Sequence, residues 1–448
     1  MFSFASFQIL LVIPERILMK TLRPYPRATI TPKGEHALEK GHPWVYEAEV
    51  TSLEPAPGEV DVTNGDIVDV VNRKGSYLGS GLLSQKSKIR IRLITRNAND
   101  RFDGAFWKRK VQWAWNYRKT VMGPDASACR VLFSEADGFP GLVVDRFDDV
   151  LVAETLSVGM ERLKPVIFLA ILEVLAEDGI AIRGLYERND ASTRTLEGLE
   201  RTTGWFTGSA SGDGRSLDPL TPGTAGTEAF GPTSTQIVEN GVRYEVDFEN
   251  GQKTGFFLDQ KYNRRAVAKL AQGHRVLDCF THTGSFALNA ARGGAEFVRA
   301  VDVSELAVDQ ARANAKLNGL EDKMMFTAAN VFDLLPSLEG SRDERYDFIV
   351  LDPPAFTKSR KTIDSAARGY KEINYRAMKL LPRGGYLATC SCSHFMDTER
   401  FRRVISYAAH DAGVQLRQIE ERQQAPDHPI LWGVPETNYL KFFLFQVV

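Results

Sequence analysis

Short apolar runs alternate with amphipathic stretches throughout the C-terminal half of the chain. Five such runs lie at residues 276–279, 298–303, 324–328, 348–351 and 386–390. Uninterrupted apolar runs of this length are typical of strands buried on both faces, and the longer stretches between them are typical of helices. The alternation predicts an α/β domain with a doubly wound, mostly parallel sheet.

The N-terminal half has a different pattern. Between residues 28 and 95, apolar and polar positions alternate with a period of two, as at 66–71 and 88–94, which predicts short strands with one buried face. Helical patterns follow at 102–121 and 163–176, with strand and turn patterns between them. We therefore predict a small β-rich domain at 21–100 and a central α+β domain at 101–206.

A segment rich in Gly, Ser, Thr and Pro separates these two domains from the C-terminal half. It covers residues 207–230 and predicts a flexible linker or surface insert. The next segment, 236–259, contains strand patterns around 242–246 and 256–258, and the dipeptide Asn250-Gly251 favours a turn between them. The C-terminal domain is therefore predicted to span 231–448 and to begin with a β-hairpin.

Composition favours a protein of several globular domains. The chain has 448 residues, of which 43% are hydrophobic and 25% are charged, a balance typical of soluble proteins. Its four cysteines are scattered, which favours a reducing, cytoplasmic location over a disulfide framework. The apolar residues before Pro14 are too few to span a membrane, so we expect no membrane association. Residues 1–20 are predicted to be a disordered leader or the product of an upstream start codon, with a weak signal peptide as the alternative.

The net charge of −1 hides a strongly basic segment. Between Arg73 and Lys119, only Asp100 and Asp103 oppose a long series of lysines and arginines. A solvated charged face usually mixes both signs, whereas an excess of one sign is the expected footprint of a phosphate-binding surface. The segment predicts RNA contacts from one face of the 88–94 strand pattern and its neighbour, at Lys86, Lys88, Arg90 and Arg92.

The apolar run at 276–279 is followed by a short turn and a helical pattern, which together form a candidate cofactor site. Gly284 in the turn allows a ligand to approach the backbone closely, and Asp302 ends the next strand, where it would bind a ribose diol. A pyrophosphate needs a G-x-G-x-x-G loop, but this turn has a single glycine. It therefore favours S-adenosylmethionine over a dinucleotide and disfavours a nicotinamide oxidoreductase.

Two further strand patterns end in reactive groups. Asp352 and Pro353 follow the 348–351 run, and Cys392 follows the 386–390 run. Because the carboxyl ends of parallel strands meet at one edge of a sheet, Asp352 and Cys392 are expected to face one crevice. Cys390 lies two positions earlier, and position alone does not distinguish the two thiols. No second ligand pair has zinc-like spacing, so no metal site is predicted.

Taken together, these motifs resemble the cytosine-5 RNA methyltransferases related to ribosomal RNA large subunit methyltransferase I. The resemblance covers nearly the whole chain from Thr21. Its motifs are GEHAL at 34–38, GHPWVY at 41–46, FSEADGFPGL at 133–142, ERND at 187–190, KTGFFLDQ at 253–260, CFTHTG at 279–284, DPPAF at 352–356, SCS at 391–393 and QAPDHP at 424–429.

The resemblance implies a PUA domain, the central α+β domain and a Rossmann-like class I methyltransferase domain with a mostly parallel seven-stranded sheet. It implies S-adenosylmethionine as the cofactor and a cytosine in large-subunit (23S) ribosomal RNA as the acceptor. A homodimer is an alternative left open. The implied cofactor site comprises Phe256, Asp278, Phe280, Thr283, Gly284, Asp302, Asn330, Val331, Asp352 and Pro353.

The resemblance also assigns roles in catalysis and RNA binding. Cys392 aligns with the nucleophile that adds to cytosine C6, and Asp352 would bind the N3/N4 edge of the base. The QAPDHP element, with Asp427 and His428, is expected near the pocket, where His428 would contact RNA or be structural. Independently of the resemblance, Lys253 would contact a phosphate or be a solvated charge of the hairpin. Two alternatives stay open: methylation of an exocyclic amine, which needs no cysteine, and an RNA-binding protein whose transferase fold is inert.

Overall fold

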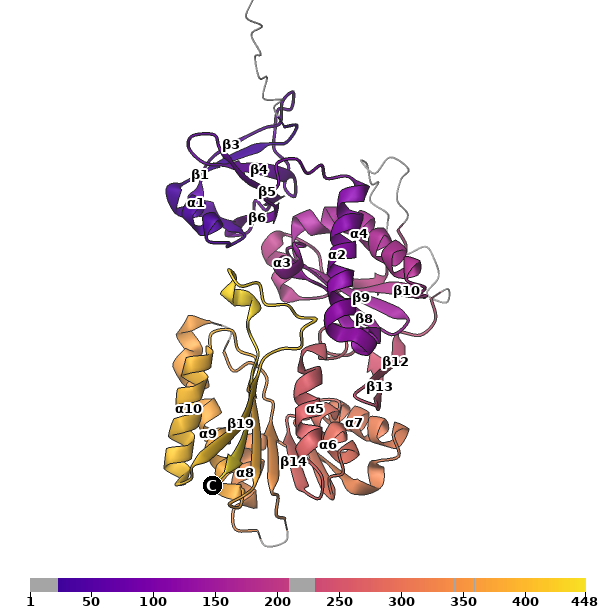
Figure 1. Cartoon of the computed structure of the whole chain (residues 1–448), viewed down its shortest axis with the longest axis vertical. Helices are drawn as coiled ribbons and strands as arrows, with labels where there is room; N and C mark the ends of the chain where they lie inside the picture. The colour runs from indigo at the N-terminus through magenta and orange to yellow at the C-terminus, as the bar shows by residue number, and fades with distance from the viewer. Residues whose placement is uncertain (1–22, 209–229, 342–343, 358) are drawn as a thin grey trace, which may run out of the picture.

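The computed structural model describes residues 23–208, 230–341, 344–357 and 359–448 (Figure 1). The predicted leader at 1–20 and most of the predicted linker at 207–230 lie outside these residues. Three main sheets follow one another along the chain and along the long axis of the molecule (Figure 1). No helix in the described residues combines the length and apolarity that a membrane span requires.

The first sheet has six strands in the order β2-β6-β5-β4-β1-β3. Apolar side chains of alternate positions, including Ile30, Val68 and Ile91, are fully buried in its core, as the period of two predicts. The elements are β1 (Arg27–Ile30), α1 (Pro32–Glu39), β2 (Trp44–Tyr46), β3 (Val50–Glu54), β4 (Ile67–Val71), β5 (Tyr77–Leu83) and β6 (Ile89–Thr95).

The second sheet has five strands in the order β11-β10-β9-β8-β7, and two long helices pack together over it. Trp107 and Trp115 of α2 and Phe168 of α4 are almost completely buried in this core. The elements are α2 (Gly104–Met122), β7 (Ala128–Phe133), α3 (Ser134–Asp137), β8 (Leu142–Phe147), β9 (Val150–Thr155), α4 (Val158–Glu177), β10 (Gly184–Asn189) and β11 (Thr202–Trp205).

The third sheet has seven strands in the order β16-β15-β14-β17-β18-β20-β19. The first five are parallel, and β20 and β19 join antiparallel. This confirms the predicted mostly parallel sheet. Its strands are β14 (Arg275–Cys279), β15 (Phe297–Asp302), β16 (Met324–Ala328), β17 (Phe348–Leu351), β18 (Tyr386–Ser391), β19 (Leu416–Arg422) and β20 (Lys441–Val447).

Helices cover both faces of this sheet and make two separate cores. One core contains side chains of α5 (Lys261–Leu270), α6 (Ser285–Arg292) and α7 (Glu305–Leu317). The other contains side chains of α8 (Val331–Leu338), α9 (Ile363–Leu380) and α10 (Thr398–Ala412). Because both faces are covered, the carboxyl edge of the parallel strands is left for a ligand.

The C-terminal domain begins with a hairpin, but both its turn and its second strand were predicted wrongly, because residues 256–258 are not a strand and 242–247 pairs with the strand before it. The strands are β12 (Ser234–Glu239) and β13 (Val242–Asp247), and the turn is Asn240-Gly241. Both turn residues have positive φ, 53° and 78°, as a two-residue type I′ turn requires. The segment around Asn250-Gly251, predicted as the turn, follows the second strand and leads into the cofactor region.

Candidate active site

The carboxyl edge of the parallel strands brings together most of the predicted site residues. Asp278 lies at the end of β14, Asp302 ends β15, Asp352 follows β17 and Cys392 follows β18, with β14 adjacent to both β15 and β17. The side chains thus line one edge, as the strand order requires.

Asp278 anchors the loop between β14 and α6. Its Oδ2 accepts hydrogen bonds from the Thr281 hydroxyl at 2.6 Å and from the Ala287 N–H at 2.9 Å. Its Oδ1 and the Thr283 hydroxyl are buried without a partner among the described residues. Burial raises the pKa of Asp278 to about 7. Buried polar atoms are almost always paired, so these two atoms fit polar groups of a bound cofactor.

Gly284 is required in this loop by its geometry. Its φ is +84°, and a Cβ at this position would lie 3.0 Å from the Cβ of Ala311 on α7. Phe280 and His282 also have positive φ, 65° and 52°, so the loop turns sharply toward the sheet edge. Burial lowers the pKa of His282 to about 4, and the ring is therefore neutral near pH 7.

The next strand ends form a place that fits an adenosine group. The two Asp302 oxygens accept the N–H groups of His282 and Ser304, each at 3.0 Å, and each oxygen keeps a lone pair for a ribose hydroxyl. Val303 and Phe332 beside them are 75% and 39% exposed, although both are large and apolar. An adenine ring would cover them. Val303 was not predicted as a site residue, although its signal is an apolar residue directly after Asp302.

Asn330 and Val331 lie at the start of α8. The Asn330 Oδ1 accepts the Phe332 N–H at 3.1 Å as an N-cap and retains one lone pair that would accept an adenine amino group. Val331 is buried, so only its backbone is available to a ligand at this edge.

Phe256, which the resemblance implies as a cofactor contact, is buried in the core instead of facing the cofactor loop. It is 3% exposed and its ring packs between Tyr244, at 4.9 Å between centroids, and the Arg264 guanidinium at 4.6 Å. The next residue, Phe257, is half-buried, and its ring lies 5.1 Å from the His282 ring of the cofactor loop. The side chain that faces the loop is therefore one position later than predicted.

The two cysteines near β18 have different environments. Cys390 is inside the strand and fully buried, whereas Cys392 follows the last strand residue and is half-buried, with its Sγ 3.9 Å from the Pro353 carbonyl oxygen. Burial, Asp352 and Asp259 raise the pKa of Cys392 to about 12, and Lys441 opposes them. Cys392 is thus the accessible thiol beside Asp352, and it needs activation.

A chain of buried amides orients Asp352. Its Oδ1 accepts the Gln260 Nε2–H at 2.9 Å, the Gln260 Oε1 accepts the Asn263 Nδ2–H at 2.6 Å, and the Asn263 Oδ1 accepts the Arg422 Nε–H at 3.2 Å. Burial and the nearby Asp259 raise the pKa of Asp352 to about 7. The carboxyl is therefore present in both protonation states near neutral pH, and the Cys390 thiol is its second hydrogen-bond partner beside Gln260.

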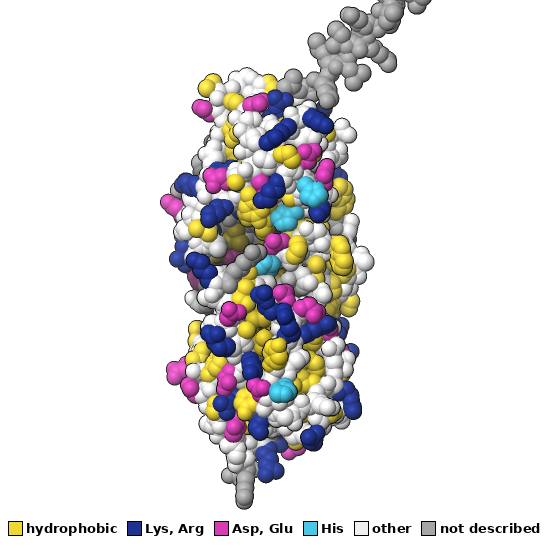
Figure 2. Space-filling view, turned by 90° about the vertical axis from the view of Figure 1, so that its left-hand side faces the viewer, with side chains coloured by type: hydrophobic (Ala, Val, Ile, Leu, Met, Phe, Trp, Pro, Cys, Tyr) yellow, Lys and Arg dark blue, Asp and Glu magenta, His cyan; other side chains and the backbone are white. Residues whose placement is uncertain are grey.

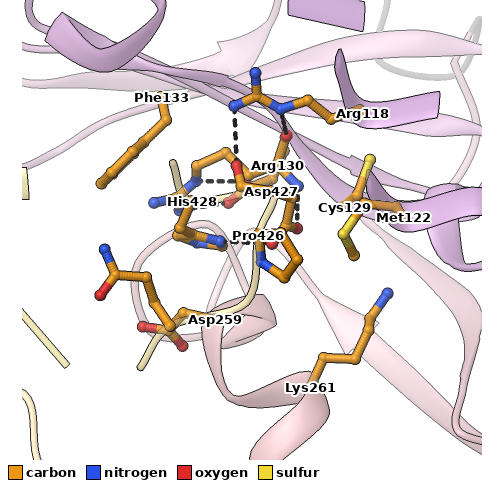
Figure 3. Close-up of polar contacts among 12 residues, drawn as sticks. Arg118, Met122, Cys129, Arg130, Phe133, Asp259, Lys261, Pro426, Asp427 and His428 are labelled. Carbon is orange, nitrogen blue, oxygen red and sulfur yellow. Dashed lines mark hydrogen bonds and ion pairs between the residues drawn. The ribbon is translucent and has the colours of Figure 1, made fainter. Parts of the chain in front are cut away.

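The predicted RNA contact by His428 is wrong, because this residue lies in the contact between the central and C-terminal domains (Figure 3). It is 2% exposed, and its Nδ1 lies 2.9 Å from the Asp427 Oδ1. The other Asp427 oxygen accepts the Arg130 N–H at 2.9 Å, and Arg118 donates to the Asp427 carbonyl at 2.9 Å. This burial is inconsistent with a direct RNA contact by His428. No sequence signal pointed to Arg118 or Arg130.

The basic segment is less uniform than the sequence indicates. Arg90 pairs with Glu47, and Arg92 pairs with Glu197 at 2.9 Å, so acids distant in sequence oppose two predicted RNA contacts. Lys86, Lys88 and Lys253 are exposed. Basic and acidic side chains are interspersed on the face in Figure 2, which also shows a recess between the upper and lower halves of the molecule. Among the described residues, no group of His, Cys, Asp and Glu side chains is arranged to hold a metal ion.

Comparisons with known proteins point to one family. The family model of S-adenosylmethionine-dependent methyltransferases matches residues 184–445, and that of the PUA-like domain matches residues 28–96. The ribosomal RNA large subunit methyltransferase I of Alteromonas mediterranea is 36% identical over 420 residues, which cover 93% of this chain and 98% of that protein. The protein of the same name from Klebsiella pneumoniae is 35% identical over 426 residues, with coverage of 95% and 99%.

Solved structures are similar at the level of the fold. A candidate methyltransferase from Streptococcus mutans has a TM-score of 0.73 at 21% identity, and the two chains are covered to 94% and 100%. A crystal structure of a candidate methyltransferase complexed with SAH has a TM-score of 0.75 at 20% identity, with the same coverage.

Proposed function

We propose that this chain, which belongs to the S-adenosylmethionine-dependent methyltransferase family and carries a PUA-like domain, methylates C5 of a cytosine in large-subunit (23S) ribosomal RNA. The names of its relatives support ribosomal RNA as the substrate. The observation that carries the cytosine-5 chemistry is the half-buried Cys392 thiol, next to Asp352 at the edge where the cofactor loop also ends.

The cofactor residues would hold S-adenosylmethionine, which supplies a methyl group on a sulfonium. The unpaired Asp278 Oδ1 and Thr283 hydroxyl would receive its methionine part, and Asp302 would accept its ribose hydroxyls. Val303, Phe332 and the N-cap Asn330 would surround its adenine. The methyl group would then lie between this site and the Cys392 thiol.

At the acceptor base, Cys392 would act as a covalent catalyst. Its thiolate forms a bond to cytosine C6, and the C5=C6 electron pair then makes C5 nucleophilic toward the methyl group. Loss of the C5 proton to a base returns the electron pair and releases the thiolate. The protonated form of Asp352 would donate to N3 and favour the addition step, and its pKa of about 7 keeps that form available. The target base would have to leave its stack to reach the Cys392 thiol.

RNA contacts outside the active site belong to the same proposal. The PUA-like domain and the exposed Lys86, Lys88 and Lys253 would contact the RNA backbone, and Arg90 and Arg92 would do so after exchange of their carboxylate partners.

Substitution of the two neighbouring cysteines tests the chemistry. Cys392→Ala is expected to reduce formation of 5-methylcytosine in ribosomal RNA to less than about 1% of wild type, because the nucleophile is lost. Cys390→Ala tests the other candidate thiol and is expected to keep a measurable part of the activity, since Cys390 is buried inside β18 and contacts Asp352 and Gln260 without being exposed to a target base. Methyl transfer from labelled S-adenosylmethionine and bisulfite mapping of the product would measure both.

The alternatives give different outcomes in the same assays. An enzyme that methylates an exocyclic amine would keep its turnover in Cys392→Ala and leave the bisulfite pattern unchanged. An inert transferase fold would show no binding of S-adenosylmethionine in calorimetry. RNA that contains 5-fluorocytosine at the target should form a stable adduct with wild type and with Cys390→Ala, and none with Cys392→Ala.

A further inference from the structure

A buried lysine lies beside the Cys392 loop. Lys441 is the first residue of β20, is 4% exposed, and pairs with Ser391 of the antiparallel neighbour β18. Its ammonium donates to the carbonyl oxygen of Ser393 at 2.7 Å and to that of Tyr439 at 2.8 Å. Ser391 pairs with Lys441 and Ser393 accepts a hydrogen bond from it, so Lys441 contacts the residues on both sides of Cys392.

This ammonium has no anionic partner within ion-pair distance among the described residues. A buried charge without a partner is costly, and the two carbonyls supply only partial compensation. An ammonium has three N–H donors, and the described residues provide acceptors for two of them. Burial lowers the pKa of Lys441 to about 8, and Cys392 opposes that shift. The arrangement leaves one donor and an unbalanced positive charge at the carbonyl of the residue that follows Cys392.

We propose that Lys441 is a positioning residue whose ammonium, held at the Ser393 carbonyl beside Cys392, stabilises the Cys392 thiolate by its charge. The inference deepens the proposed function, because a thiolate is the species that adds to cytosine C6. Two carboxylates near the sulfur, Asp352 and Asp259, disfavour the thiolate, so the cation from the opposite strand offsets them. The other titratable or charged groups that face this pair are Cys390, Tyr370, Tyr439 and Asp397.

The alkylation rate of Cys392 by iodoacetamide tests the inference without RNA or cofactor. The other three cysteines are fully buried, so the native enzyme should react at Cys392, and peptide mapping with a Cys392→Ser control would verify the site. Wild type is expected to react about tenfold faster per pH unit up to about pH 8 and to level off above it, because loss of the Lys441 proton then cancels the gain.

Two variants separate the charge from the shape of this side chain. Lys441→Met should react at least about tenfold more slowly at pH 7, with a rate that rises steadily through pH 8. Lys441→Arg keeps the charge at every pH tested, so its rate should stay near that of wild type at pH 7 and rise without levelling off. Lys261→Met is the matched control, because Lys261 is 1% exposed and also donates to two carbonyls, at Asp125 and Ala128.

The outcomes are distinguishable from those of the proposed function. Identical pH profiles for wild type and Lys441→Met would overturn the coupling between Lys441 and Cys392. The same change in alkylation rate in both Lys441 variants, including Lys441→Arg, would assign the lysine a purely structural role and would also overturn the coupling. Retention of methyl transfer by Cys392→Ala would refute the covalent mechanism while leaving the measured thiol coupling intact.

Discussion

At the scale of single residues, the fold raises the pKa of two carboxyls, Asp278 and Asp352, to about 7, and both lie at the ends of parallel strands. Carboxyls with strongly shifted pKa values concentrate at functional sites, because burial and neighbouring charges there adjust the pKa of each group to its task. Asp278 is the clearer case, since one of its oxygens has no partner at all among the described residues.

Asp278→Asn should therefore increase stability and weaken cofactor binding. The pKa of Asp278 in the folded state is above the ordinary 3.8. Its contribution to the free energy of unfolding is therefore fully present below about pH 4 and is lost as pH rises through 7. The free energy of unfolding of the cofactor-free variant should exceed that of wild type by about 2 to 4 kcal/mol at pH 8 and be similar at pH 4. Chemical denaturation at both pH values measures this difference, and a difference independent of pH would contradict it. Affinity for S-adenosylmethionine should fall at least about tenfold in calorimetry.

At the scale of elements, the loop between β14 and α6 shows what the sequence can and cannot predict. The apolar run and Gly284 predicted the strand, the turn and the cofactor. The positive φ of Phe280 and His282 was not predictable, because large residues rarely adopt it and only the packing of the loop imposes it. The hairpin turn was missed for a related reason: two Asn-Gly dipeptides were available in this segment, and burial of Ile237 opposite Tyr244 in one core selects the first.

Gly284→Ala should impair this loop more than an ordinary glycine substitution does. Its Cβ would contact Ala311 at 3.0 Å in addition to the strained φ of +84°, so we expect a loss of about 2 to 3 kcal/mol in unfolding free energy and severely reduced cofactor binding. Gly273→Ala is the matched control, because its φ is +76° and no atom lies within 4 Å of the added Cβ. It should lose only about 1 kcal/mol. Equal losses in thermal or chemical unfolding would show that the contact with Ala311 is unimportant.

At the scale of the whole molecule, the segment between β19 and β20 connects all three domains. Ala425 donates to the Asp259 carbonyl at 2.7 Å beside the active site, Asp427 accepts the Arg130 N–H of the central domain, and His42 of the PUA-like domain lies 3.6 Å from Glu436. Figure 1 shows this segment rising from the C-terminal sheet toward the two other domains. The sequence placed QAPDHP near the pocket by resemblance, but burial of its histidine depends on a partner domain that periodicity does not reveal.

Asp427→Ala should therefore loosen the contact between the central and C-terminal domains. Burial opposes ionisation of Asp427, but His428, Lys261 and the Arg130 N–H outweigh it and lower its pKa, so the carboxylate is charged and paired at neutral pH. Removal leaves the His428 ring nitrogen and the Arg130 N–H buried without a partner, which should cost about 2 to 4 kcal/mol of unfolding free energy. Asp411→Ala removes an exposed carboxylate paired with Lys371 at 2.6 Å and should change stability far less in the same denaturation series. Below its unfolding transition, Asp427→Ala should still bind S-adenosylmethionine yet methylate RNA poorly, because the cofactor loop lies within one domain whereas the proposed RNA-binding surface spans the PUA-like and C-terminal domains. Equal stability of the two variants, or full RNA methylation by Asp427→Ala, would exclude this segment as the element that holds this surface together.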